Sequence, residues 1–78
     1  MNFLTDELRY IIRKVYMMND ANARSLVELG MQEGRDKHNH EEASMYCAKA
    51  QGLWYANATL QGELEKAGLL DILKGVHT

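Results

Sequence analysis

The sequence contains no proline, and it contains no Asn-Gly or Asp-Gly pair of the kind that closes two-residue β-hairpins. Because proline interrupts helices and sheets alike, its absence leaves long regular elements unbroken. Valine, isoleucine and threonine, which favour strands, are also few. Together these absences predict an all-α fold built from long helices joined by short connections.

Cysteine is nearly absent as well, since Cys47 is the single one. One cysteine excludes a disulfide within the chain and fits a reducing compartment, so we expect the protein in the cytoplasm. Cys47 itself is interpreted as a small core residue. The length of 78 residues predicts one small domain, residues 1–78. Because so small a domain buries only about 60% of its unfolded surface, a partner subunit is an expected source of additional stability.

Neither charge sign dominates, and the formal net charge of −2 does not favour a polyanionic partner. The most apolar run, residues 43–62, has the length of a membrane span. It contains Lys49 and three side-chain amides, however, which make it too polar for the centre of a bilayer. The N-terminus lacks the basic start and apolar run of a secretory signal. We therefore expect no membrane contact.

The first predicted helix covers about residues 5–33, with Thr5 as its N-cap and Asp6 and Glu7 in its first turn. Apolar residues recur on one face at helical spacing, namely Leu8, Ile11, Ile12, Val15, Met18, Leu26 and Leu29. Because this stripe keeps its phase across residues 19–22, we expect one continuous helix. Asn22 lies within the stripe, where a polar residue either fixes register or oligomeric state or meets water at a local irregularity.

On the side opposite the stripe, Tyr10, Met17 and Met31 recur at multiples of seven residues, with Arg24 in the intervening place. Isolated apolar residues on a surface need no explanation. A row of tyrosine and methionine is more typical of a contact surface, although scattered surface residues remain the alternative.

Gly34 is expected to end the first helix, and residues 35–40 form a short polar joint, so the second helix should return antiparallel. That helix is predicted over about residues 41–67 and lacks an obvious polar face, so it should be covered on all sides. One face has the bulk to pack against the stripe of the first helix: Ala43, Tyr46, Cys47, Ala50, Leu53, Trp54, Asn57 and Leu64. The other is small, consisting of Ala48, Gly52, Ala56 and Thr59 flanked by Met45 and Tyr55. We expect this small face to form an oligomer interface, because small residues let another helix approach closely.

The hairpin geometry also places Asn57 opposite Met18 and Asn19, where two amides can satisfy each other inside the seam. Gly68 is expected to stop the second helix. The apolar segment of residues 69–74 then forms a short helix that folds back over the open end of the hairpin, near Phe3 and Leu4.

No motif for catalysis or for a cofactor is present. His38, His40, Glu41 and Glu42 lie close together, but their spacing matches no zinc pattern and favours a solvated loop. Neither serine has a nucleophile-like context, and Cys47 has no basic neighbour placed to activate its thiol. We expect a protein that is not an enzyme and that holds no cofactor or metal.

The sequence therefore favours a non-enzymatic helical module that binds another protein, as an adaptor or an inhibitor. Small motif-free chains of this kind are often accessory proteins or viral proteins that modulate a host. The expected anchors are aromatic and methionine residues, which dominate such contacts: Tyr10, Met17, Met31, Trp54 and Tyr55.

Two other classes of function stay open. Arg9, Arg13 and Arg24 lie near one side of the first helix together with tyrosines, a combination that can bind phosphate and stack bases. The acidic overall charge speaks against nucleic acid. The third possibility is a helical oligomer that holds a small anionic ligand between its subunits, with arginine and tyrosine side chains lining the seam.

Overall fold

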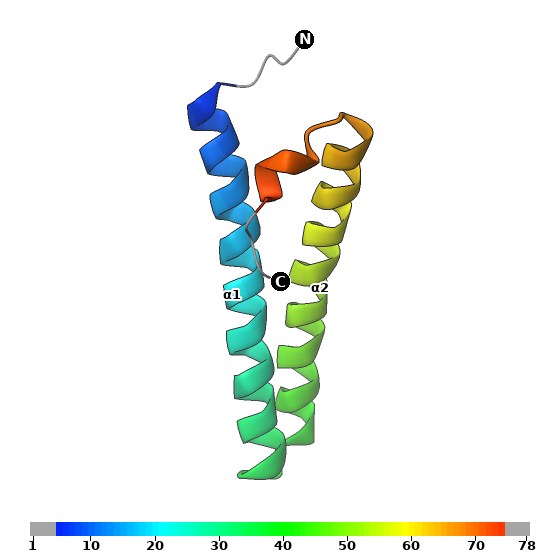
Figure 1. Cartoon of the computed structure of the whole chain (residues 1–78). Coiled ribbons are helices and arrows are strands. Elements are labelled where there is room, and N and C mark those ends of the chain that lie inside the picture. Colours follow the sequence, from blue (N-terminus) through cyan, green and yellow to red (C-terminus); the bar gives the residue numbers. More distant parts are fainter. Residues whose placement is uncertain (1–4, 75–78) are drawn as a thin grey trace.

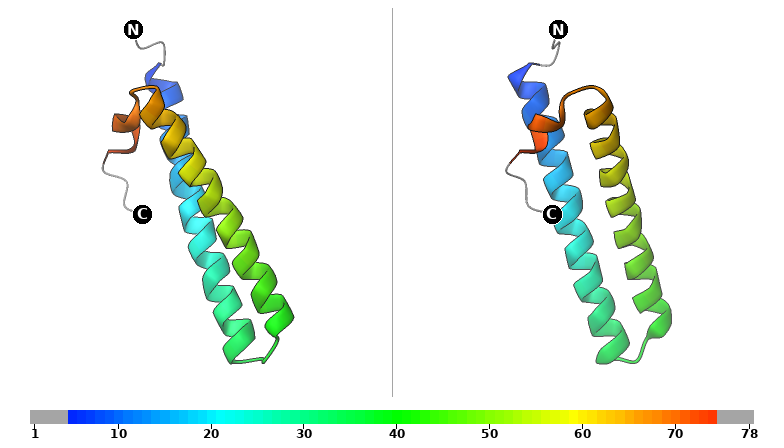
Figure 2. Two further views of the ribbon diagram at one scale, coloured as in Figure 1. Left: turned by 90° about the vertical axis from the view of Figure 1, so that its right-hand side faces the viewer. Right: turned by 45° about the vertical axis from the view of Figure 1, so that its right-hand side comes forward.

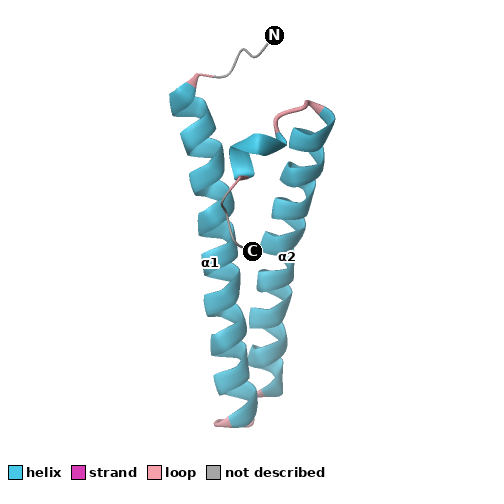
Figure 3. Ribbon diagram, viewed as in Figure 1, coloured by secondary structure: helices cyan, strands magenta, loops and turns pink. Residues whose placement is uncertain are grey.

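The computed structural model describes residues 5–74, which form an antiparallel helical hairpin with a short third helix (Figure 1). Helix α1 spans Asp6–Arg35, helix α2 spans His40–Lys66, and the 3₁₀ helix η1 spans Leu70–Leu73. The described part of the chain contains no strand (Figure 3). The molecule is a rod, with principal extents of 53 × 18 × 15 Å. The predicted all-α hairpin is confirmed.

Helix α1 begins at its predicted cap, because the Thr5 hydroxyl accepts a hydrogen bond from the Leu8 backbone N–H at 3.2 Å. It is continuous through residues 19–22, as expected. Gly34, however, does not end it. Gly34 remains helical, and a Cβ at this position would lie 3.4 Å from the Ala43 Cβ, in ordinary van der Waals contact with the start of α2. The chain reverses instead at His38, which has a φ of 56°.

Helix α2 starts after Asn39, whose side chain accepts a hydrogen bond from the Glu42 N–H at 3.2 Å. It ends where Gly68 takes a φ of 73°, as predicted. The Leu69 N–H then donates to the Leu64 carbonyl at 2.8 Å, which closes the last turn. The segment that follows forms a single 3₁₀ turn rather than an α-helix.

The two long helices meet along a seam that repeats every seven residues, with alternating steps of three and four, as in an antiparallel coiled coil. All of the seam residues are buried or half-buried. On α1 they are Arg9, Ile12, Tyr16, Asn19, Ala23, Leu26, Gly30 and Glu33. On α2 they are Ala43, Tyr46, Ala50, Leu53, Asn57, Leu60 and Leu64. The predicted packing face of the second helix is thus largely the observed one.

The prediction for α1 was wrong, because its apolar stripe does not pack against α2. Leu8, Ile11, Val15, Met18 and Leu29 are 43–52% exposed, and only Ile12 and Leu26 contribute to the seam. Relative to that prediction, α1 is rotated by about a quarter of a turn.

Close approach of the two helices explains the rotation. A Cβ on Gly30 would lie 3.2 Å from the Ala43 carbonyl oxygen and 3.3 Å from the Tyr46 Cβ. Ala23 and Ala50 are completely covered, at 0% exposure. Bulky Leu and Ile side chains at these positions would hold the helices apart, so the face of α1 that contains Ala23 and Gly30 packs inward and most of the stripe stays outside.

Helix η1 lies on one side of the plane formed by the hairpin (Figure 2). Its Ile72 is buried, and Asp71 forms an ion pair with Arg9 of α1. The short segment therefore covers one flank of the seam where the long helices diverge. The predicted contact with Phe3 and Leu4 lies outside the described residues.

Candidate protein-binding surfaces

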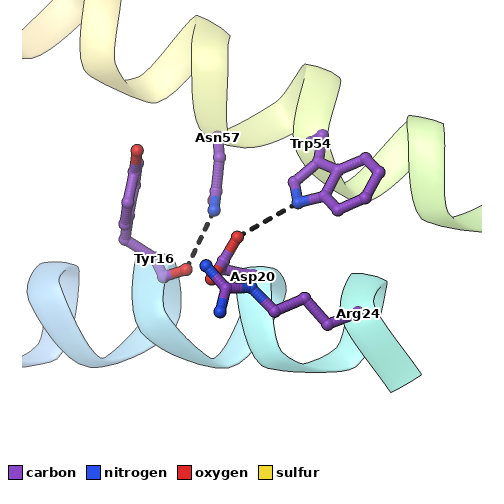
Figure 4. Close-up of polar contacts among 5 residues, drawn as sticks. All are labelled: Tyr16, Asp20, Arg24, Trp54 and Asn57. Carbon is purple, nitrogen blue, oxygen red and sulfur yellow. Dashed lines mark hydrogen bonds and ion pairs between the residues drawn. The ribbon is translucent and has the colours of Figure 1, made fainter. Parts of the chain in front are cut away.

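The centre of the seam is a polar cluster whose hydrogen bonds join the two long helices (Figure 4). The Asn57 amide nitrogen donates to the Tyr16 carbonyl at 2.9 Å, and the Asn57 amide oxygen accepts from the Asn19 side chain at 3.0 Å. The predicted pairing of Asn19 with Asn57 is confirmed. Within the described residues, no buried side-chain nitrogen or oxygen lacks a hydrogen-bond partner. The fully buried polar atoms of this cluster are therefore all engaged in joining the two helices.

Asp20 links the two helices one turn further along. Its carboxylate, in a residue only 9% exposed, accepts a hydrogen bond from the Trp54 indole N–H at 3.1 Å. The same carboxylate pairs with the Arg24 guanidinium at 3.0 Å. Trp54 therefore lies at the edge of the seam, 39% exposed, and its polar atom is already engaged.

A second seven-residue repeat on α1 is left uncovered. It consists of Leu8, Ile11, Val15, Met18, Asn22, Ser25 and Leu29, which we call the lateral face. Arg9 and Asp20 mark the flank of the seam that carries η1 and Trp54. Helical periodicity places the lateral face on the opposite flank. All seven of its residues are exposed, and five of them are large apolar side chains.

The outer face of α1 carries a hollow of about 530 Å³, lined by Tyr10, Arg13, Lys14, Met17, Met18 and Ala21. Tyr10 is 64% exposed, and the Lys14 ammonium lies 5.9 Å from the centre of its ring. Neither Arg13 nor Lys14 forms an ion pair with another residue of the described range. An apolar hollow edged by two free cations can take an apolar side chain with a carboxylate beside it.

The structure does not gather the three predicted anion-binding arginines. Arg9 pairs with Asp71 and Arg24 pairs with Asp20, which leaves Arg13 as the free one. A smaller hollow of about 250 Å³ does lie beside Arg9 and Arg13, but Asp71 also lines it. That carboxylate weakens the attraction for an anion, so the arrangement favours neither a phosphate nor nucleic acid.

The expected partner anchors do not form one surface. Tyr10 and Met17 line the hollow, while Met31 lies further along α1, 53% exposed. Trp54 belongs to the seam edge, and Tyr55 is 76% exposed on α2. Sequence reasoning missed Lys14 and Ala21 as lining residues. Their signal was present in the spacing, since both lie within one or two turns of Met17 on the same face.

The predicted oligomer face of α2 is fully exposed in the single chain, at Ala48, Gly52, Ala56 and Thr59. Nothing lies within 4 Å of a Cβ built on Gly52. The Thr59 hydroxyl donates to the Tyr55 carbonyl of its own helix at 3.0 Å. Because these side chains are small and exposed, another helix backbone can approach them closely.

The remaining candidates for chemistry stand apart from these surfaces. Cys47 is exposed, so its interpretation as a core residue was wrong, although its sulfur borders Gly30 at the rim of the seam. A hydrogen bond to Glu33 raises the pKa of Lys37 above its ordinary value, and this pair lies near the hairpin turn. Residues 5–74 contain no group of three metal-ligating side chains placed to hold an ion. No helix among these residues is long and apolar enough to cross a membrane.

The chain matches no known protein family, no curated protein and no solved structure.

Proposed function

We propose that this chain is a non-enzymatic helical module that binds another protein, as an adaptor or an inhibitor, through the outer face of α1. The observation that carries the proposal is the hollow between Tyr10, Met17 and Met18, which is apolar and edged by the free cations of Arg13 and Lys14. Aromatic and methionine side chains are enriched at protein interfaces, and cations at the rim select the partner by charge.

The chemistry of the hollow defines the partner. An apolar anchor of the partner enters beside Met17, and acidic residues flanking that anchor meet Arg13 and Lys14. An acidic amphipathic helix has this combination of groups. We also propose that the chain self-associates, because large apolar side chains on the lateral face and small residues on α2 remain exposed in the single chain.

The test is quantitative affinity capture from a lysate of the source organism with three immobilised chains. One is the native chain, one carries Tyr10→Ala with Met17→Glu, and one carries Tyr55→Ala as a matched control outside the hollow. We expect a specific protein on the native and Tyr55→Ala chains and its loss of tenfold or more from the double variant. Equal capture by all three chains would refute binding through the outer face.

A further inference from the structure

We infer that the lateral face of α1, together with the small face of α2, binds a second copy of this chain in antiparallel orientation and forms a four-helix bundle. This inference rests on the proposed self-association and specifies its geometry. The two surfaces adjoin each other, since Met18 belongs to both, and Lys14 and Ala21 line the outer hollow as well as the edge of the lateral face.

The pattern of the lateral face is that of a coiled-coil seam. Leu8, Val15 and Leu29 alternate with Ile11 and Met18 in steps of three and four, and Asn22 occupies one place of the repeat. The lateral face lies about 100° around α1 from the seam with α2. A helix with two seams at roughly a right angle has two neighbours, as every helix of a four-helix bundle does.

Charges along the edge of the lateral face determine the orientation. Exposed residues follow one another every seven positions: Glu7, Lys14, Ala21, Glu28 and Arg35. In this order, residues at equal distances on the two sides of Ala21 carry opposite charges. An antiparallel copy places Glu7 beside Arg35 of the second copy, and Lys14 beside its Glu28, and the same two pairs recur by symmetry.

A parallel copy satisfies none of these charges. In that orientation the edge faces the row of Ile12, Asn19, Leu26 and Glu33 of the second copy. These residues are half-buried against their own α2, and the one charged member, Glu33, already pairs with Lys37. Among residues 5–74, the one ion-pair partner of Arg35 is its neighbour Asp36, at 3.6 Å, with both side chains more than 60% exposed. The antiparallel copy gives every charge of this edge an opposite one.

Helix α2 fits the same symmetry axis. Asp20 precedes Ala21 in the sequence and lies close to the proposed axis. Because the Trp54 indole donates a hydrogen bond to Asp20, Trp54 is the residue of α2 at the level of this axis. Trp54 is the midpoint between Gly52 and Ala56, the smallest residues of the exposed face. A two-fold axis at this level therefore brings Gly52 of each copy opposite Ala56 of the other, where no side chain holds the helices apart.

The exposed area agrees with a dimer. The chain exposes 5852 Å², whereas a globular protein of 8.9 kDa exposes about 4,800 Å². The difference is about 1,000 Å² for each chain, and a stable interface of standard size covers about 800 Å² on each partner.

A charge swap at Lys14 and Glu28 tests the inference by analytical ultracentrifugation at low ionic strength. We expect Lys14→Glu and Glu28→Lys to raise the dimer Kd by tenfold or more each, because every reversal replaces two attractions with two repulsions. The double variant, Lys14→Glu with Glu28→Lys, restores the native Kd to within about threefold. Lys74→Glu and Glu65→Lys make the same changes in net charge at exposed positions away from the interface, and they leave the Kd unchanged.

The possible failures separate the inference from the proposal on which it rests. A native dimer that tolerates both single reversals overturns the antiparallel register while leaving self-association intact. A native chain that sediments as a monomer up to several hundred micromolar overturns both. Circular dichroism of each variant, expected to match the native helicity, excludes unfolding as the cause of a lost dimer.

Discussion

Helix α1 carries two seven-residue repeats that differ in composition and in what covers them. The seam repeat contains Tyr16, Asn19, Ala23 and Gly30, and α2 covers it. The lateral repeat contains most of the large aliphatic side chains of the helix, and nothing within the described chain covers it. The more apolar of the two faces is thus the one that the hairpin leaves outside.

This difference shows that apolar content does not by itself select which face of a helix pairs within the chain. Ala23, Gly30 and Ala50 let the two helices approach closely, and close approach brings Asn57 and Trp54 within hydrogen-bond distance of α1. Packing density and paired polar groups favour this face, while the Leu and Ile side chains remain available to another chain.

The largest loss of stability is expected from a bulky substitution inside the seam. Ala23→Leu adds bulk at a position with 0% exposure, and we expect the free energy of unfolding to fall by about 3 kcal/mol. Urea unfolding followed by circular dichroism measures the loss. Ala58→Leu, the same change at an exposed position of α2, should alter the unfolding free energy by less than about 0.5 kcal/mol. Equal effects of the two substitutions would contradict the close approach of the helices.

A smaller effect is expected when the same substitution, Asn to Leu, is made inside the seam and on the lateral face. Asn57→Leu leaves the Asn19 amide without its partner in the seam, and we expect a loss of about 2 kcal/mol in thermal or urea unfolding. Asn22→Leu changes an exposed residue of the lateral face, so it should leave the stability of the single chain nearly unchanged and preserve or tighten the dimer. A stabilising effect of Asn57→Leu would show that the polar cluster does not hold the helices together.

Much of the fold followed from the sequence, because its signals are local. Thr5 marks a helix start through its side-chain cap, and Gly68 marks a helix end through its backbone freedom. The missing prolines leave both long helices unbroken. The Asn19–Asn57 pair followed from the position of the turn and the antiparallel return of the chain. These inferences need no knowledge of how tightly the helices pack.

The rotation of α1 did not follow, because it depends on a comparison between faces rather than on one face alone. The stripe centred on Val15 is the stronger amphipathic signal, and nothing local reveals that Gly30 and Ala43 allow a closer contact elsewhere. Cys47 was misplaced for a related reason, since its membership of a packing face did not show that it lies at the rim. The outer hollow was missed for a similar reason. The small residue Ala21 helps to line it, whereas the sequence prediction considered only large side chains as anchors.

Disulfide trapping tests the central claim, that the lateral face belongs to an antiparallel second copy. In a Cys47→Ser background, chains carrying Ile11→Cys are mixed with chains of different mass carrying Leu29→Cys and are oxidised. These two positions lie equally far along α1 from Asp20, so the antiparallel copy brings them opposite each other, within the short distance that a disulfide requires. The account predicts a mixed disulfide between the two kinds of chain. Disulfides joining only Ile11→Cys chains to each other, or no disulfide at concentrations where the dimer forms, would contradict it.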